Sequence, residues 1–251
     1  DSKAKISNNV KIGPYTVIGP NVEIDEKTEI QSHVNITGNT KIGKNNKIYP
    51  FASIGNDPQD LKFQGEETKL EIGNNNKIRE YVTINPGTKG GGGLTKVGNN
   101  CLFMVSAHIA HDCFVGNNVI LANNVPLGGH AHIDDNAIIG GNSAVQQFTR
   151  VGKSAMIGGM CGVVRDIIPY GIAHGNRSVL QGLNLIGFPE VASNPTCIFL
   201  TALLYMSSLA RHTAVHVTYK CNRHYLPNAH RALFFRRTFD NQSGRVLRHA
   251  Q

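Results

Sequence analysis

Histidines are the residues of this chain that could do chemistry, and they are unevenly spread. His108, His111, His130 and His132 lie within 25 residues of one another, and Asp112 directly follows His111. A histidine beside a carboxylate can serve as a general base, because the acid orients the ring and stabilises the imidazolium that forms on proton removal. The pair could therefore deprotonate an alcohol for attack on a thioester. The alternative is a set of solvated surface histidines.

The elements that position these histidines follow a period of six residues. Large apolar residues, beginning with nine isoleucines in an unbroken row, occupy every sixth position over 6–54, 72–84 and 97–163. This period fits neither an α-helix nor a plain alternating strand, so each hexad must be one short strand and a corner. Three hexads per turn predict a triangular solenoid of about 18 residues per coil, with large residues stacked from coil to coil.

The predicted fold class is all-β, a parallel β-helix of hexapeptide repeats with two inserted loops. The insertions span 55–71 and 85–96, where the row is interrupted. Smaller residues two positions before the large ones, such as Val34 and Ala107, suit the corners. The stacked aliphatic side chains contribute about 25 cal/mol per Å² of apolar surface buried, which offsets the cost of ordering the coils.

The chain divides into two predicted regions. Residues 1–187 form the β-helix, and residues 188–251 form a smaller C-terminal region that contains helix. In that region Asn194 and Pro195 resemble a helix cap and a first-turn proline, which predicts a helix over 196–210.

The coil period brings candidate site residues to one edge of the β-helix. One coil after Asp112 stands His130, and one coil further stands Phe148, next to Gln147. Neighbouring coils lie about 4.8 Å apart, so imidazole, carboxylate and amide groups from three coils can converge on one small molecule. Gly129 suits a close approach of the backbone, whose N–H could hold a tetrahedral oxyanion.

Two other features have plainer interpretations. Cys101, Cys113 and Cys161 fall on the small corner position and form no Cys-x-x-Cys pair, which indicates packing residues and no zinc or redox motif. The glycine run 90–93 lacks the Lys-Ser/Thr of a phosphate-binding loop, so it predicts a flexible loop that projects from a coil corner.

Charge and hydropathy limit the partners and the compartment. Residues 188–251 hold 8 Lys and Arg against 2 Asp and Glu, yet they lack the recognition motifs of nucleic-acid-binding proteins. The chain has neither the roughly 18 apolar residues of a membrane-spanning helix nor an apolar signal core at its start. We therefore expect a cytoplasmic protein without nucleic-acid binding or stable membrane insertion.

Six strings within residues 1–187 carry a family resemblance: Pro50-Phe-Ala-Ser-Ile-Gly, Asp60-Leu-Lys62, Gly92-Gly-Leu-Thr-Lys96, His108-Ile-Ala-His111-Asp112, Leu121-Ala-Asn-Asn and Ile138-Ile-Gly-Gly141. They resemble the UDP-N-acetylglucosamine 3-O-acyltransferases of the hexapeptide-repeat acyltransferases. The resemblance implies a left-handed β-helix and a homotrimer with sites at subunit clefts. It also implies transfer of an (R)-3-hydroxyacyl group from acyl carrier protein to the 3-hydroxyl of UDP-N-acetylglucosamine, the first step of lipid A biosynthesis, without cofactor or metal.

The resemblance also implies roles for individual residues. By the family's pattern, His111 is the general base, Asp112 orients it, and the Gly129 amide binds the oxyanion. The implied substrate contacts are Asp60, Lys62, His108, His130, Gln147 and Asn184. Basic loop residues could attract the acidic carrier protein; they are Lys62, Lys89 and Lys96.

The chain departs from the family pattern after Asn184. Gly187-Phe-Pro-Glu190 replaces a segment that usually carries a basic pair, and Gln146 and Arg177 stand where the family commonly has histidine. Two alternatives stay open: a β-helical scaffold with impaired catalysis, and a β-helical carbonic anhydrase that binds zinc through three histidines. The His-x-x-His spacing is closer than the spacing expected for the anhydrase.

Overall fold

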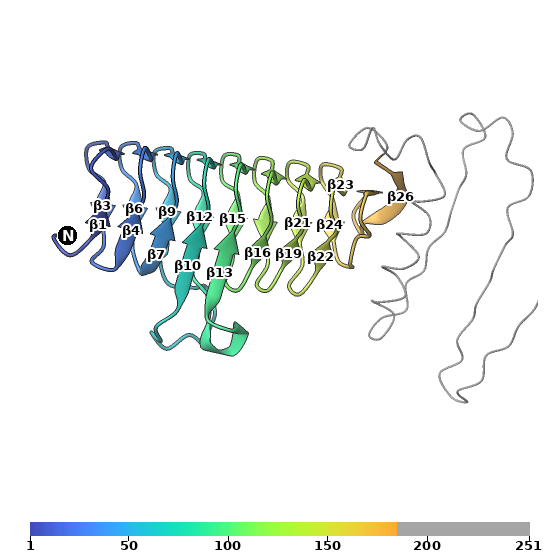
Figure 1. Cartoon of the computed structure of the whole chain (residues 1–251). Coiled ribbons are helices and arrows are strands. Elements are labelled where there is room, and N and C mark those ends of the chain that lie inside the picture. Colours follow the sequence, from blue (N-terminus) through green and yellow to red (C-terminus); the bar gives the residue numbers. More distant parts are fainter. Residues whose placement is uncertain (185–251) are drawn as a thin grey trace, which may run out of the picture. The chain divides into compact units, whose positions relative to one another are not determined.

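The computed structural model describes residues 1–184, and the predicted helix 196–210 and C-terminal region 188–251 lie outside the described residues. Within residues 1–184, two- to five-residue strands alternate with tight corners. Figure 1 shows them stacked as successive coils of one β-helix. The predicted all-β fold class is confirmed.

The strands form three sheets, named faces 1, 2 and 3 here. Face 1 contains β1 (Lys5–Ile6), β4 (Val22–Ile24), β7 (Asn39–Ile42), β10 (Lys69–Ile72), β13 (Leu94–Val97), β16 (Phe114–Val115), β19 (His132–Ile133) and β22 (Arg150–Val151). Face 2 contains β2 (Lys11–Ile12), β5 (Glu29–Ile30), β8 (Lys47–Ile48), β11 (Lys77–Ile78), β14 (Leu102–Phe103), β17 (Ile120–Leu121), β20 (Ile138–Ile139), β23 (Met156–Ile157), β25 (Gly171–His174) and β26 (Val179–Leu183). Face 3 contains β3 (Val17–Ile18), β6 (Asn35–Ile36), β9 (Ser53–Ile54), β12 (Thr83–Ile84), β15 (His108–Ile109), β18 (Pro126–Leu127), β21 (Ala144–Val145) and β24 (Gly162–Val163).

Strand pairing is parallel on all three faces, except that β26 pairs antiparallel with β25 at the end of face 2. Equivalent residues of neighbouring coils lie opposite one another, as Phe114 does to His132 and His132 to Arg150. This register keeps the large apolar rows in vertical stacks inside the prism. The rows are buried from Ile18 onward, whereas Ile6 and Ile12 are 37% and 44% exposed because the first coil has a neighbour on one side alone.

The corners depend on residues in the left-handed backbone conformation. Non-glycine residues three positions after the buried row adopt φ angles near +60° at most corners. Asparagine is frequent among them, because its short polar side chain tolerates this conformation better than most others. The corner that leads from face 3 to face 1, named the 3–1 corner here, instead uses Asp112, His130 and Phe148 in consecutive coils.

Both insertions leave the β-helix at the 3–1 corner. Residues 55–68 connect β9 to β10, and residues 85–93, with the 3-10 helix η1 (Lys89–Gly91), connect β12 to β13. Each insertion ends earlier than the sequence predicted, because β10 and β13 are four-residue strands that extend the ladder of face 1. Figure 1 shows both insertions projecting from the same side of the coils. Within residues 1–184, no helix has the length and apolar character needed to cross a membrane.

Candidate active site

The 3–1 corner brings His111, Asp112 and His130 together. His111 Nδ1 lies 2.8 Å from Asp112 Oδ2, and the His130 ring meets the His111 ring edge-on, with centroids 5.1 Å apart. The side chains of His111 and Asp112 are 10% and 1% exposed, so the carboxylate is buried while the ring reaches the surface. Because Nδ1 faces the carboxylate, Nε2 is the nitrogen available to accept a proton.

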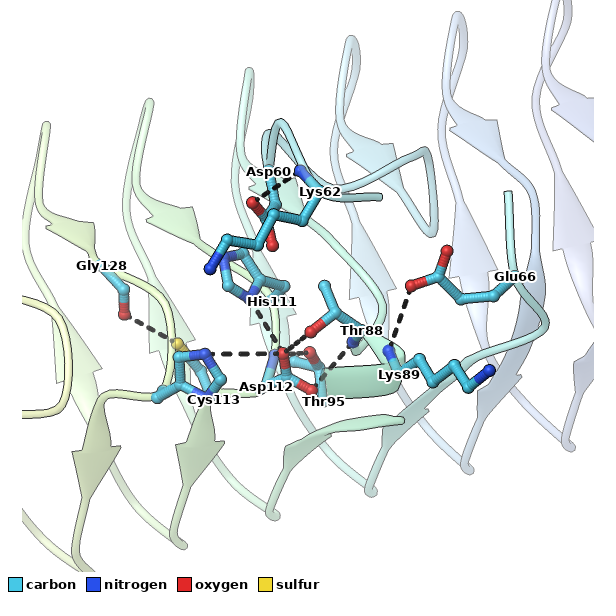
Figure 2. A network of polar contacts seen from close by, with 11 residues as sticks. Asp60, Lys62, Glu66, Thr88, Lys89, Thr95, His111, Asp112, Cys113 and Gly128 are labelled. Carbon is cyan, nitrogen blue, oxygen red and sulfur yellow. Dashed lines mark hydrogen bonds and ion pairs between the residues drawn. The ribbon is translucent and has the colours of Figure 1, made fainter. Parts of the chain in front are cut away.

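The second insertion holds the Asp112 carboxylate from the other side. The Thr88 hydroxyl donates to Asp112 Oδ2 at 2.6 Å, and the Thr88 N–H donates to Oδ1 at 2.9 Å. The Asp112 N–H in turn donates to the Thr95 hydroxyl oxygen at 2.8 Å. Figure 2 shows these contacts converging on Asp112. Sequence reasoning missed both threonines.

Gly129 lies against the His111 ring. A Cβ atom at this position would stand 2.5 Å from His111 Cε1 and 2.6 Å from Nε2, so no larger residue fits while the ring keeps its place. The Gly129 N–H donates to no other residue within 1–184. The 3–1 corner therefore presents His111 Nε2 as a base and the Gly129 N–H as a hydrogen-bond donor, and no other described residue binds this N–H.

His130 and Gln147 extend the site into the next coils. The His130 ring stacks on Phe148 with centroids 4.3 Å apart and an interplanar angle of 7°. Gln147 is exposed and packs directly beyond Gly128, whose added Cβ would meet Gln147 Cγ at 3.1 Å. The predicted stacking of Asp112, His130 and Phe148 on one edge is confirmed, because His130 Nε2 lies 3.9 Å from Asp112 Oδ2 and the His130 ring stacks on Phe148.

His108 borders the same edge from β15. Its Nδ1 lies 2.7 Å from the Thr83 hydroxyl. Burial, followed by the nearby charge of His111, lowers the pKa of His108 below its ordinary value of 6.5. His132, by contrast, lies on face 1 and pairs with Asp134 at 3.0 Å, so it is not part of the 3–1 corner.

The first insertion carries Asp60 and Lys62. Asp60 Oδ1 accepts the Lys62 N–H at 3.1 Å, and the Lys62 side chain is exposed. Figure 2 shows both residues on the same side of the β-helix as His111. The two insertions are tied together, because Glu66 Oε1 accepts the Lys89 N–H at 3.2 Å.

Asn184 lies apart from these residues. Its side-chain amide donates to the Ser154 carbonyl at 3.0 Å, at the corner between faces 1 and 2. One chain therefore brings together the histidines, Asp112, Gly129 and Gln147, and it does not bring Asn184 to them.

One ligand atom from each of His111, Asp112 and His130 lies within 4.8 Å of the others, so the described residues include one group that could hold a metal ion. Asp112 Oδ2 already accepts hydrogen bonds from Thr88 and pairs with His111. A metal ion would have to break this arrangement.

The cysteines are packing residues, as predicted. Cys101, Cys113 and Cys161 are buried. Burial raises the pKa of Cys101 to about 11 and that of Cys113 to about 12, which keeps both thiols protonated at neutral pH.

The coils and corners define the class of protein first. Residues 3–38 match the family described as bacterial transferase hexapeptide (six repeats). The described chain is therefore a left-handed β-helix of hexapeptide-repeat transferases, in agreement with the fold of the solved structures it resembles.

Known relatives then identify the family. The acyl-(acyl-carrier-protein)–UDP-N-acetylglucosamine O-acyltransferase of Rickettsia peacockii (strain Rustic) is 62% identical over 183 residues, which are 73% of this chain and 69% of the relative. The solved structure of LpxA from Acinetobacter baumannii is 44% identical, with a TM-score of 0.77 over 82% of this chain and 80% of that one. The UDP-N-acetylglucosamine O-acyltransferase (LpxA) of Moraxella catarrhalis RH4 is also 44% identical, with a TM-score of 0.77 over 85% of this chain and 83% of that one. The chain belongs to the acyl-(acyl-carrier-protein)–UDP-N-acetylglucosamine O-acyltransferase family.

Proposed function

We propose that the chain transfers an (R)-3-hydroxyacyl group from acyl carrier protein to the 3-hydroxyl of UDP-N-acetylglucosamine, the first step of lipid A biosynthesis. The observation that carries this proposal is the buried His111–Asp112 pair, with Nδ1 and Oδ2 2.8 Å apart, beside Gly129. The names of the relatives supply the two substrates, and the corner supplies a base for the hydroxyl.

In this mechanism His111 Nε2 accepts the proton of the sugar hydroxyl as its oxygen attacks the thioester carbonyl. Asp112 stabilises the resulting imidazolium, and the Gly129 N–H holds the tetrahedral oxyanion. When the intermediate collapses, the C–S bond breaks and the imidazolium returns its proton to the departing carrier thiol. The products are the 3-O-acylated sugar nucleotide and the free thiol of the carrier.

We assign substrate contacts to Asp60, Lys62, His108, His130, Gln147 and Asn184. The lowered pKa of His108 keeps its ring neutral near neutral pH, which suits hydrogen bonding to an uncharged sugar. The carrier protein is the second partner. Lys62, Lys89 and Lys96 are exposed on or next to the two insertions, where they can attract an acidic surface.

We further propose that the working form is a homotrimer in the cytoplasm, with residues 1–187 as catalytic domain and 188–251 as a separate C-terminal region. Asn184 supports a shared site, because within one chain its amide bonds Ser154 at a different corner from His111. A second copy could bring this residue to the histidines. Sedimentation equilibrium would report a mass near three chains if the proposal holds and one chain if it fails.

The test is transfer of 3-hydroxyacyl groups of several chain lengths from acyl carrier protein to UDP-N-acetylglucosamine. His111→Ala should lower kcat by about 10²- to 10⁴-fold, the usual contribution of a general base. His132→Ala, which alters a histidine on face 1 outside the 3–1 corner, should leave kcat unchanged. Full turnover by His111→Ala would contradict the assignment of the base, and no turnover by a folded wild-type protein would contradict the activity.

The two alternatives are not favoured. Relatives at about 60% identity are named O-acyltransferases, which speaks against a carbonic anhydrase. The catalytic pair, its glycine and its histidine neighbour are all in place at the 3–1 corner, which speaks against an impaired scaffold.

A further inference from the structure

We infer that Thr88 is a positioning residue for the acyl transfer, and that its hydroxyl fixes the Asp112 carboxylate in the plane that aligns His111. The inference rests on the proposed function, because it concerns how the base is held. Thr88 does not contact the reacting atoms, so its effect must pass through Asp112.

The hydrogen bonds of the Asp112 carboxylate show why Thr88 matters. Oδ2 pairs with His111 Nδ1 at 2.8 Å and accepts the Thr88 hydroxyl at 2.6 Å, while Oδ1 accepts the Thr88 N–H at 2.9 Å. Two of these three contacts therefore come from one residue of the second insertion. With Asp112 6% exposed and Thr88 4% exposed, solvent has little access to replace a lost donor.

A carboxylate can rotate about its Cβ–Cγ bond unless both oxygens are anchored. Thr88 donates to both, so it sets the plane of the group and thereby the direction in which Oδ2 meets His111. If the hydroxyl is lost, the Thr88 N–H still holds Oδ1, but among the described residues the one hydrogen-bond partner left on Oδ2 is the His111 ring itself, so Oδ2 and the ring can shift together. Small misplacements of a catalytic group lower the rate strongly, because the reacting atoms must be aligned within tenths of an ångström.

The glycines of the second insertion allow this contact. A Cβ atom at Gly91 would overlap the Asp112 carboxylate, and one at Gly87 would stand 2.8 Å from Asp112 Oδ1. The Thr88 carbonyl accepts the N–H groups of Gly91 at 3.0 Å and Gly93 at 2.8 Å, which closes the turn around the threonine. The glycine run was predicted as a flexible projecting loop, but at Gly91 the close approach to Asp112 requires glycine.

Thr88→Val tests the inference cleanly. Valine keeps the branched shape of the side chain and the main-chain N–H to Oδ1, and it replaces the hydroxyl with a methyl group that cannot donate. We expect kcat to fall at least tenfold, a part of the 10²–10⁴ that a general base contributes, with KM for both substrates within about twofold of wild type. Thr88→Ser, which restores the hydroxyl, should return kcat to within about threefold of wild type.

The matched control is Thr28→Val. Thr28 is fully buried, and its hydroxyl donates to the Gly43 carbonyl at 2.9 Å without contact to the site. Circular dichroism and thermal unfolding show whether each variant is folded. If Thr88→Val does not fold, Thr88→Ala serves the same purpose, because it also keeps the N–H. Thr28→Val should retain wild-type kcat whatever it loses in stability.

A double-mutant cycle separates positioning from a general structural effect. In the Asp112→Asn variant, Thr88→Val should lower kcat no further, because the two residues act as one unit. Additive losses, a change in KM alone, or failure of Thr88→Ser to restore kcat would overturn the inference. So would wild-type kcat in Thr88→Val while His111→Ala shows its expected loss of kcat, and that result would leave the proposed function standing.

Discussion

The 3–1 corner and the corner between faces 1 and 2, named the 1–2 corner here, share one backbone design but differ in what their side chains do. Two positions after the buried row, the 1–2 corner carries the polar series Asn74, Asn99, Asn117 and Asp135. Each side-chain oxygen accepts the N–H of its counterpart in the preceding coil, as Asn117 Oδ1 does for Asn99 at 2.9 Å. At the same hexad position the 3–1 corner carries His111, Gly129 and Gln147.

The difference shows how a repeat acquires a site. At the 1–2 corner the side-chain oxygens bind the neighbouring backbone, so the ladder stabilises the coils. At the 3–1 corner Gly129 has no side-chain oxygen to accept the His111 N–H, and the His111 ring lies over it. Gln147 stands where the ladder would place the acceptor of the Gly129 N–H, but it is exposed and makes no such bond among the described residues. The Gly129 N–H then donates to no other residue within 1–184. The break of the ladder between Gly129 and Gln147 therefore leaves a backbone donor available for a ligand.

The largest effect should come from adding a side chain at Gly129. Gly129→Ala places a methyl group against the His111 ring, 2.5 Å from Cε1, so the ring must move. We expect kcat to fall about 10²-fold, because a displacement near 1 Å costs this much. Gly141→Ala is the matched control, since it has the same hexad position at another corner and its Cβ would meet its first neighbour at 3.5 Å. Steady-state assays measure kcat for both variants. Equal losses of kcat would contradict the special role of the 3–1 corner.

A smaller effect, on stability alone, should follow from breaking the ladder. Asn117→Ala removes the acceptor of the Asn99 N–H and leaves it unsatisfied. We expect the free energy of unfolding to fall by about 0.5–1.5 kcal/mol, the net contribution of one hydrogen bond, because this donor is only partly buried. Urea unfolding measures this, and the kcat of the folded variant should match wild type. A loss of kcat would show that the two corners are not separate in function.

The smallest effect should be a pH dependence specific to the site edge. Because burial lowers the pKa of His108, the unfolded chain binds more protons than the folded one as the pH falls below about 6.5. The free energy of unfolding should therefore decrease from about pH 6.5 downward, until the folded-state pKa is passed. His108→Gln should flatten this slope in urea unfolding between pH 7 and pH 5, and Asn117→Ala should not, because the ladder amide does not titrate. An unchanged slope in His108→Gln would refute the assignment of this pH dependence to His108.

Much of the fold and part of the site could be predicted from the sequence. The row from Ile18 to Val163 is buried as its period predicts, and the coil count places Asp112, His130 and Phe148 at one corner. These predictions succeed because the parallel register places residues that are one coil apart in the sequence next to one another in space. Where the period breaks, the prediction weakens, so the insertions ended earlier than predicted.

The sequence by itself determined the repeat, the edge on which the histidines lie and the family to which their motifs point. The tertiary structure alone decided what holds them: Thr88 on Asp112, and the His111 ring over Gly129. The physical reason is that residues inside the repeat are positioned by stacking, which the period encodes. A loop residue is positioned by the path of its loop, and no period encodes that path.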